Sequence, residues 1–304
     1  MKDNNATQKI VAIIGPTASG KSDIAVSLAL QFNGELISAD SRQVYRGLDI
    51  GTGKITQEEM RGVPHHLLDV ADPKEQFSVT QFQKLGKIAI SEIIEKGKLP
   101  IICGGTGLYV NALIDNRVYP DVPPNEALRK HLTNYATAEL VRELEKLDPR
   151  RAGEIDVNNP RRLVRAIEVA SSLGSVPSLP LIHNSNSIIL IGLNPPADVL
   201  RERINKRLIS RLDAGMVDEV ANLHKNGLSW ERLNSFGLEY RYVSRFLQGL
   251  LTEDELIEKL GTEIWRYSRR QMTWWRKDER VHSLWENAEK EALILVNEFM
   301  SIGQ

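Results

Sequence analysis

The segment that decides the fold is residues 10–22, which read IVAIIGPTASGKS. The β-branched run at its start predicts a short buried strand over residues 10–14. The apolar residues Ile24, Ala25, Leu28 and Ala29 recur at spacings of three and four, which predicts a helix that begins at Lys21. Between strand and helix lies a match to the phosphate-loop pattern G-x-x-x-x-G-K-[ST]. The matching residues are Gly15, Pro16, Thr17, Ala18, Ser19, Gly20, Lys21 and Ser22.

Each part of this loop suits an anionic ligand. The glycines permit a tight turn whose backbone N–H groups point inward, and the helix N-terminus favours negative charge. Lys21 adds a mobile positive charge, and the Ser22 hydroxyl is a ligand for Mg²⁺. The simpler alternative is an ordinary glycine-rich turn, but the complete motif between a strand and a helix favours phosphate binding. We therefore expect a diphosphate- or triphosphate-bearing substrate.

The motif identifies the phosphates of the ligand and leaves the reaction open. One possibility is phosphoryl transfer, as in a small-molecule kinase. The other uses diphosphate as the leaving group, with attack on carbon. A nucleoside triphosphatase usually carries an acidic residue at the end of a neighbouring strand, whereas the predicted strand 99–103 runs into Gly104-Gly105 without a carboxylate. This observation favours the second chemistry.

The rest of the chain predicts an α/β fold with a mostly parallel sheet, as in P-loop nucleoside triphosphatases. Further strands are expected at residues 35–38, 99–103 and 188–193, and helices at residues 81–96 and from Leu108 onward. Residues 120–187 are predicted to be a helical insertion, preceded by a proline-rich linker. The catalytic core would comprise residues 1–119 and 188–304, with a helix-rich C-terminal part. Ligands of parallel sheets bind at the carboxyl ends of the strands, where the loops 15–22, 40–45 and 104–107 are expected to meet.

Composition limits the classes of function. The 304 residues include 39 Lys and Arg against 40 Asp and Glu, so any nucleic-acid surface must be a local patch. The only cysteine is Cys103, which excludes an intrachain disulfide framework and a cysteine-rich zinc site. No signal peptide or membrane span is expected from the sequence. A cytoplasmic protein fits these observations.

Two side chains outside the phosphate loop are candidates for chemistry. Asp40 follows the second predicted strand, where its carboxylate would act as a general base toward an incoming nucleophile or would cap the next helix. Thr106 would donate a hydrogen bond to a bridging oxygen of the substrate or would cap a helix. The residues alone leave both alternatives open.

At this point the sequence resembles the bacterial tRNA dimethylallyltransferases. The resemblance rests on an ordered set of motifs over about residues 10–280. They are GPTASGKS (15–22), DSRQVY (40–45), DIGTGK (49–54), GVPHHL (62–67), GGTGLY (104–109), NPRRLVRAIEV (159–169) and RQMTWWR (270–276). The set as a whole is far more specific than the phosphate loop by itself.

The resemblance implies transfer of a dimethylallyl group from dimethylallyl diphosphate to N6 of an adenosine. This adenosine is 3′-adjacent to the anticodon of tRNAs that read codons starting with U. By the same resemblance, Asp40 is the base, Thr106 lies near the bridging oxygen, and Arg207 lies near the diphosphate with Mg²⁺. We expect a monomer whose partners are dimethylallyl diphosphate and the tRNA anticodon stem-loop.

The resemblance also implies which residues contact tRNA, with the helical insertion as a clamp. These residues are Asp40, Ser41, Arg42, Gln43, Thr106, Arg129, Arg161, Arg162, Leu163, Val164, Arg165 and Arg241. For the arginines of 161–165 the alternative is a solvated helix face. Relatives often carry a different run where this chain reads Gly237-Leu-Glu-Tyr-Arg241, so the register near Arg241 is open.

Three further features of the sequence could be sites. Residues 261–280 carry six basic and three acidic side chains interleaved with aromatics, which suits RNA, although we expect some tryptophans to pack in a core. His65 and His66 are expected to be structural, because neighbours on an extended segment point to opposite faces. Cys103 is expected to be a buried apolar residue.

The main alternatives to tRNA prenyl transfer are an isopentenyltransferase acting on free adenylate, a small-molecule kinase, and a tRNA-binding protein without catalysis. The insertion and the basic aromatic segment argue against the first. A complete phosphate loop with Asp40 argues against the last.

Overall fold

The structure is a computed structural model that describes residues 8–115, 119–178, 187–276 and 278–302. It divides the chain into two compact units. The first combines Met1–Asn116 with His183–Gln304, and the second is Arg117–Ile182. The insertion had been predicted at residues 120–187, so the boundaries in the structure fall slightly earlier at both ends.

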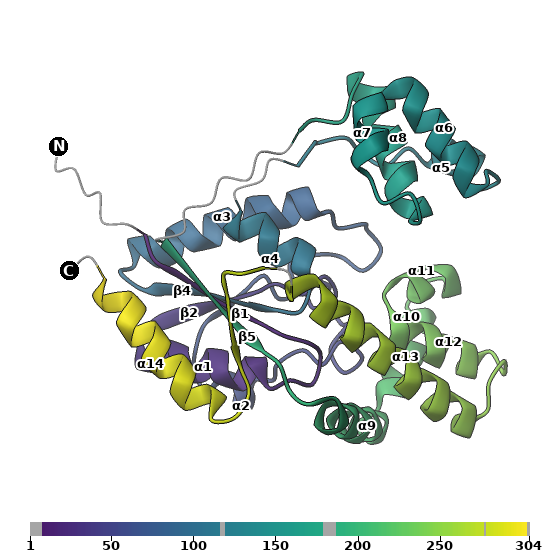
Figure 1. The fold of residues 1–304 in the computed structure, drawn as a ribbon. Helices are drawn as coiled ribbons and strands as arrows, with labels where there is room; N and C mark the ends of the chain where they lie inside the picture. Colours follow the sequence, from purple (N-terminus) through teal and green to yellow (C-terminus); the bar gives the residue numbers. More distant parts are fainter. Residues whose placement is uncertain (1–7, 116–118, 179–186, 277, 303–304) are drawn as a thin grey trace. The chain divides into compact units, whose positions relative to one another are not determined.

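Six strands of the described residues form one sheet in the order β3-β2-β4-β1-β5-β6, and all neighbouring pairs are parallel. This arrangement confirms the predicted α/β class (Figure 1). The strands are β1 (Ile10–Ile14), β2 (Gly34–Ser38), β3 (His65–His66), β4 (Leu99–Gly104), β5 (Ile188–Leu193) and β6 (Val281–Leu284). Because β1 lies between β4 and β5, the phosphate loop that follows it begins at the centre of the sheet.

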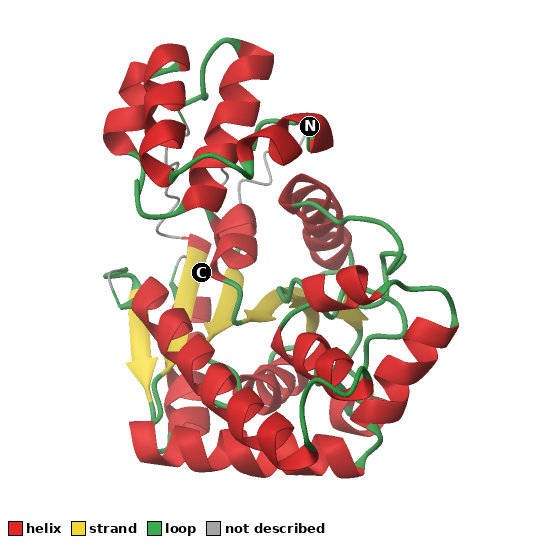
Figure 2. Ribbon diagram, turned by 90° about the vertical axis from the view of Figure 1, so that its right-hand side faces the viewer, coloured by secondary structure: helices red, strands yellow, loops and turns green. Residues whose placement is uncertain are grey.

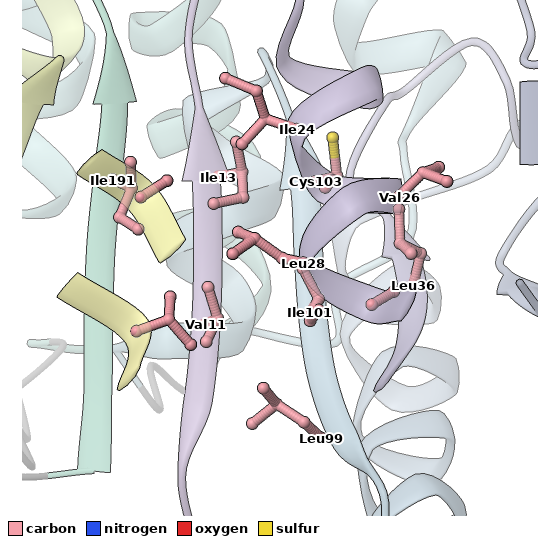
Figure 3. Close-up of a cluster of buried hydrophobic side chains, with 14 of the residues drawn as sticks. Val11, Ile13, Ile24, Val26, Leu28, Leu36, Leu99, Ile101, Cys103 and Ile191 are labelled. Carbon is pink, nitrogen blue, oxygen red and sulfur yellow. The ribbon is translucent and has the colours of Figure 1, made fainter. Parts of the chain in front are cut away.

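Helices cover both faces of the sheet, as Figures 1 and 2 show. On one face are α1 (Lys21–Gln31) and α14 (Ala288–Ser301), and on the other are α3 (Val79–Glu95) and α4 (Gly107–Ile114). Figure 3 shows alternate strand residues, among them Val11, Ile13 and Ile101, with Leu28 of α1 in one buried cluster. Burial of this apolar surface is the main stabilising term of the first unit.

Local sequence explains where the predicted helices begin and end. Ser78 forms a capping box with Gln81, so α3 starts at Val79, two residues before the predicted start. Gly97 follows the helix with φ of +69°, a conformation that favours glycine. Neither β3 nor β6 had been predicted, because strands of two and four residues lack a readable period.

Further helices of the described residues complete the first unit, and the shortest of them is α2. They are α2 (Gln57–Met60), α9 (Ala197–Asp213), α10 (Met216–Lys225), α11 (Trp230–Ser235), α12 (Leu238–Leu247) and α13 (Glu253–Trp275). The strands point with their carboxyl ends toward α9 and α13 (Figure 1). No helix in the described part of the chain has the length and apolar character needed to cross a membrane.

The second unit is helical, as predicted for the insertion. Its helices are α5 (Glu126–Leu132), α6 (Thr137–Leu147), α7 (Pro149–Glu154) and α8 (Pro160–Leu173). They enclose a separate apolar core that includes Leu140, Leu144, Leu163 and Ile167. The unit therefore has the packed interior of an independent domain.

Candidate active site

The phosphate loop has the conformation that its sequence predicts. Ala18 and Gly20 have positive φ angles of 62° and 91°, and the Ser19 amide donates to the Pro16 carbonyl at 3.3 Å. Lys21 Nζ donates to the same carbonyl oxygen at 3.2 Å, so its ammonium lies over the loop. Burial is the main cause that lowers the pKa of Lys21, and the nearby Arg207 and Arg211 lower it further, while Cys103 and Asp40 raise it. An anionic ligand would relieve this mutual repulsion.

A buried glutamine connects two of the three predicted loops. Gln271 of α13 accepts a hydrogen bond from the Thr17 amide at 2.9 Å and donates to the Gly105 carbonyl at 3.0 Å. A side chain at Gly105 would overlap the Gln271 amide, which explains glycine there. Sequence reasoning did not assign Gln271 to the site, since its partners lie more than 160 residues away.

Asp40 uses one carboxylate oxygen to shape its own loop. Its Oδ1 accepts from the amides of Arg42 at 2.8 Å and Gln43 at 3.4 Å. The Gln43 side chain accepts from the Ser38 hydroxyl and donates to the Gly53 carbonyl at 3.1 Å, so this loop is joined to residues 49–54. Oδ1 therefore shapes a turn, because residues 41–44 form turns and the helix that Asp40 was expected to cap as an alternative does not follow it.

Helix α9 brings a row of arginines to the site. Arg207 Nη2 donates to the Gly53 carbonyl at 3.3 Å, and Arg211 Nη1 donates to the Gly51 carbonyl at 3.4 Å. Burial and the neighbouring Arg211 lower the pKa of Arg207 to about 10. Arg203, one turn earlier, donates to the Ser19 carbonyl at 3.4 Å. The sequence signal for Arg203 and Arg211 was their spacing of four from Arg207, which places all three on one face of a helix.

Apart from Arg203, these side chains line one open cleft of about 1200 Å³, including its solvent-filled mouth. Of the predicted residues, Thr17, Lys21, Ser22, Asp40, Ser41, Arg42, Gln43 and Arg207 line it. Arg211, Glu239, Tyr267 and Gln271 also line it and had not been predicted. No carboxylate directly follows β4. Asp40, which lines this cleft, follows β2, as expected.

Thr106 does not line this cleft. It is the N-cap residue of α4, but its hydroxyl makes no capping hydrogen bond. Its side chain interacts with Tyr267, whose pKa is raised to about 12, chiefly by burial and by the charge of Asp40. Thr106 thus contacts a residue of the cleft, Tyr267, and it occupies the N-cap position without the side-chain hydrogen bond. Its hydrogen bond to a bridging oxygen of the substrate stays a prediction.

The oxygen donors of the cleft fit Mg²⁺ without a dedicated cage. Among the described residues no three His, Cys, Asp or Glu side chains gather around a common metal position. Mg²⁺ commonly retains waters and uses one or two protein oxygens with substrate phosphates, so such a cluster is not required. The exposed Ser22 at the start of α1 and Asp40 in the same cleft supply oxygens of this kind.

The predicted tRNA contacts in the second unit divide into two sets. Arg129 forms a two-pronged pair with the fully buried carboxylate of Glu168, at 2.7 and 3.0 Å, and Arg165 contacts the same carboxylate at 3.3 Å. Leu163 lies in the apolar core with Val164 packed against it, so the Leu163 side chain is not exposed to a ligand. Arg161 and Arg162 are exposed, and Arg162 has only a 3.9 Å pair with Asp156.

The remaining candidates have structural contacts. Arg241 donates to the Asn234 carbonyl at 3.4 Å. His66 pairs with the buried Glu35 at 2.7 Å, while His65 Nδ1 lies 2.8 Å from the Val63 carbonyl, which accords with a structural role. Cys103 is buried, and burial raises the pKa of its thiol to about 11. In the aromatic segment Trp275 is buried and Trp274 is exposed, the mixture that was expected.

Comparison with known proteins gives a consistent result. The family described as IPP transferase matches residues 43–278. The tRNA dimethylallyltransferase 1 of Geotalea uraniireducens is 41% identical over 271 residues, 89% of each chain. That of Syntrophus aciditrophicus is 42% identical over 297 residues, 94% of this chain and 96% of the relative.

Solved structures agree in fold. The tRNA isopentenylpyrophosphate transferase of Bacillus halodurans superposes with a TM-score of 0.73 at 40% identity, covering 96% of this chain and 97% of that one. A eukaryotic dimethylallyltransferase acting on tRNA gives a TM-score of 0.80 at 26% identity, covering 97% and 80%. By sequence and by fold, the chain belongs to the tRNA dimethylallyltransferase family of IPP transferases.

Proposed function

We propose that this protein transfers the dimethylallyl group of dimethylallyl diphosphate to N6 of the adenosine 3′-adjacent to the anticodon, in tRNAs that read codons starting with U. The observation that carries the proposal is the composition of the cleft. Thr17, Lys21 and Ser22 of the phosphate loop line it together with Arg207 and Arg211, and Asp40 enters where a nucleoside triphosphatase would not place its acidic residue. Such a cleft suits a departing diphosphate and a nucleophile that must lose a proton.

The reaction forms a bond from adenine N6 to C1 of the prenyl group and breaks the bond from C1 to the diphosphate oxygen. The loop amides and Lys21 bind the diphosphate, and Arg207 and Arg211 stabilise the charge that grows on it. Asp40 accepts the proton released from N6. Ser22 would hold Mg²⁺, which when bound neutralises charge on the diphosphate.

Adenine N6 is a weak nucleophile, so positioning of both substrates carries much of the catalysis. The target base must leave its stack to enter the cleft, with the anticodon stem-loop as the bound part of the tRNA. Action as a monomer stays a prediction. A cytoplasmic location stays a prediction.

An incorporation assay tests the proposal. Purified protein receives Mg²⁺, labelled dimethylallyl diphosphate and either unmodified tRNA or AMP, and the labelled nucleoside is identified after digestion of the tRNA. We expect label on the adenosine next to the anticodon. Label in AMP alone would show a free-nucleotide enzyme, and ATP hydrolysis without label transfer would show a kinase-like activity. Substituting a longer prenyl diphosphate tests the length of the donor chain.

A further inference from the structure

A carboxylate outside the cleft holds the loop on which the site's arginines rest. Glu219 lies in the first turn of α10. Its Oε2 accepts from the amides of Ile50 at 2.6 Å and Asp49 at 3.0 Å, and its Oε1 accepts from the Gly51 amide at 3.0 Å. Three successive backbone donors on one carboxylate make a strong, charge-assisted anchor.

The anchor is itself fixed from a third element. The Tyr240 hydroxyl of α12 donates to Glu219 Oε1 at 2.7 Å, and Tyr240 is only 1% exposed. Gly51 packs so closely against this ring that a side chain would not fit, since a Cβ there would be 2.7 Å from Tyr240 Cζ. The 49–54 loop is thus held between α10 and α12, over a sequence separation of about 170 residues.

The other side of the same loop faces α9. The carbonyls of Gly51 and Gly53 accept the hydrogen bonds of Arg211 and Arg207. A Cβ at Gly53 would overlap the terminal nitrogens of both guanidinium groups. The position of this loop therefore decides where the two cations lie in the cleft.

We propose that Glu219 is a positioning residue for the diphosphate site, because it fixes the 49–54 loop whose carbonyls aim Arg207 and Arg211 at the phosphates. The inference rests on the proposed function for the identity of the substrate. Glu219 does not line the cleft, so it acts only through the loop. Replacing one carboxylate oxygen by an amide nitrogen leaves at least one of the three backbone amides without its acceptor, so the loop and both arginines can shift.

The test compares Glu219→Gln with Asp218→Asn, a neighbour in the same first turn that is exposed. Both variants lose one negative charge at the same helix end. Calorimetry measures the Kd of inorganic diphosphate, filter binding measures the Kd of tRNA, and steady-state assays give kcat and KM for the prenyl donor. We expect Glu219→Gln to weaken diphosphate binding and to lower kcat/KM for the donor by about 10²-fold, the effect of a displacement near 1 Å, with unchanged tRNA affinity.

A second variant displaces the same two arginines by a substitution in the 49–54 loop itself. Gly53→Ala leaves Glu219 intact and should produce the same kinetic pattern. The double variant should lose little more than either single variant, since both act through one loop. If Glu219→Gln does not fold, Tyr240→Phe replaces it, because this variant removes the hydroxyl that holds Glu219 and should weaken diphosphate binding in the same way.

The proposal is overturned if Glu219→Gln binds diphosphate as tightly as Asp218→Asn, or if it weakens diphosphate and tRNA equally. Normal diphosphate affinity in Gly53→Ala would also overturn it. A wild-type protein that binds diphosphate but modifies no tRNA would instead contradict the proposed function. In that case the Kd of diphosphate for the Glu219→Gln variant would still test the role of Glu219.

Discussion

At the scale of single residues, Asp40 has two tasks that one substitution can separate. Its Oδ1 shapes the 40–43 turn, and a carboxylate is needed for proton transfer. Asp40→Asn keeps an acceptor for the turn but removes the base, whereas Asp40→Ala removes both. We expect both variants to lower kcat by about 10²–10⁴-fold with nearly unchanged tRNA affinity.

The measurement is single-turnover prenyl transfer with saturating tRNA. Near-normal turnover in Asp40→Asn together with a slow Asp40→Ala would assign Asp40 to the turn alone. The Asn variant is therefore the more informative of the two.

Which site residues could be predicted from sequence depends on how local their contacts are. The phosphate loop and Asp40 lie directly after strands, so short motifs indicated them. Gln271 and Glu219 act through partners more than 160 residues away, so even the motif RQMTWWR, which contains Gln271, does not show what that side chain contacts. Arg211 could have been predicted from the sequence, because it is one turn from Arg207 on the same helix.

At the scale of elements, helix α8 carries arginines of two kinds. Some contact a buried carboxylate and stabilise the fold, and others are exposed and available to a ligand. Arg165, like Arg129 of α5, contacts the buried Glu168, whose pKa is lowered because these hydrogen bonds outweigh the effect of burial. Arg161 and Arg162 lie in the first turn, where positive charge is unfavourable for the helix. Their exposed charges are thus better explained by a phosphate ligand than by helix stability.

We expect Arg161→Ala and Arg162→Ala to weaken tRNA binding. Each should reduce the slope of log K against log salt by about 0.7–0.9 for every RNA phosphate that the arginine neutralises in the wild-type complex. Thermal unfolding of the protein should not change. Arg165→Ala should instead lower thermal stability, because it removes a partner of a buried charge. An unchanged salt slope for Arg161 and Arg162 would identify them as a solvated helix face.

The secondary elements themselves were predicted unevenly for a physical reason. The central strands β1, β4 and β5 are continuous apolar runs, since a parallel sheet buries both of their faces. The edge strands β3 and β6 are short and partly exposed, so their sequences carry no such run. These two segments become strands because they pair with β2 and β5, and this pairing depends on the tertiary structure and not on the local sequence.

At the scale of the whole molecule, the two units have separate cores, which predicts separable effects on the two substrates. Leu144 is fully buried in the second unit, and Leu28 is fully buried between α1 and the sheet of the first. Either residue changed to Ala should cost about 2–5 kcal/mol of local stability. The diphosphate site lies wholly in the first unit, and the exposed arginines of α8 lie in the second.

Leu144→Ala should therefore weaken tRNA affinity while the Kd of inorganic diphosphate stays at its wild-type value. Leu28→Ala should weaken diphosphate binding, because α1 begins at the phosphate loop and its N-terminus would lose its support from the sheet. Calorimetry with diphosphate and filter binding with tRNA measure both, at a temperature where each variant is folded by circular dichroism. Equal loss of both affinities in Leu144→Ala would show that the second unit also supports the phosphate site, and the division of labour between the units would be wrong.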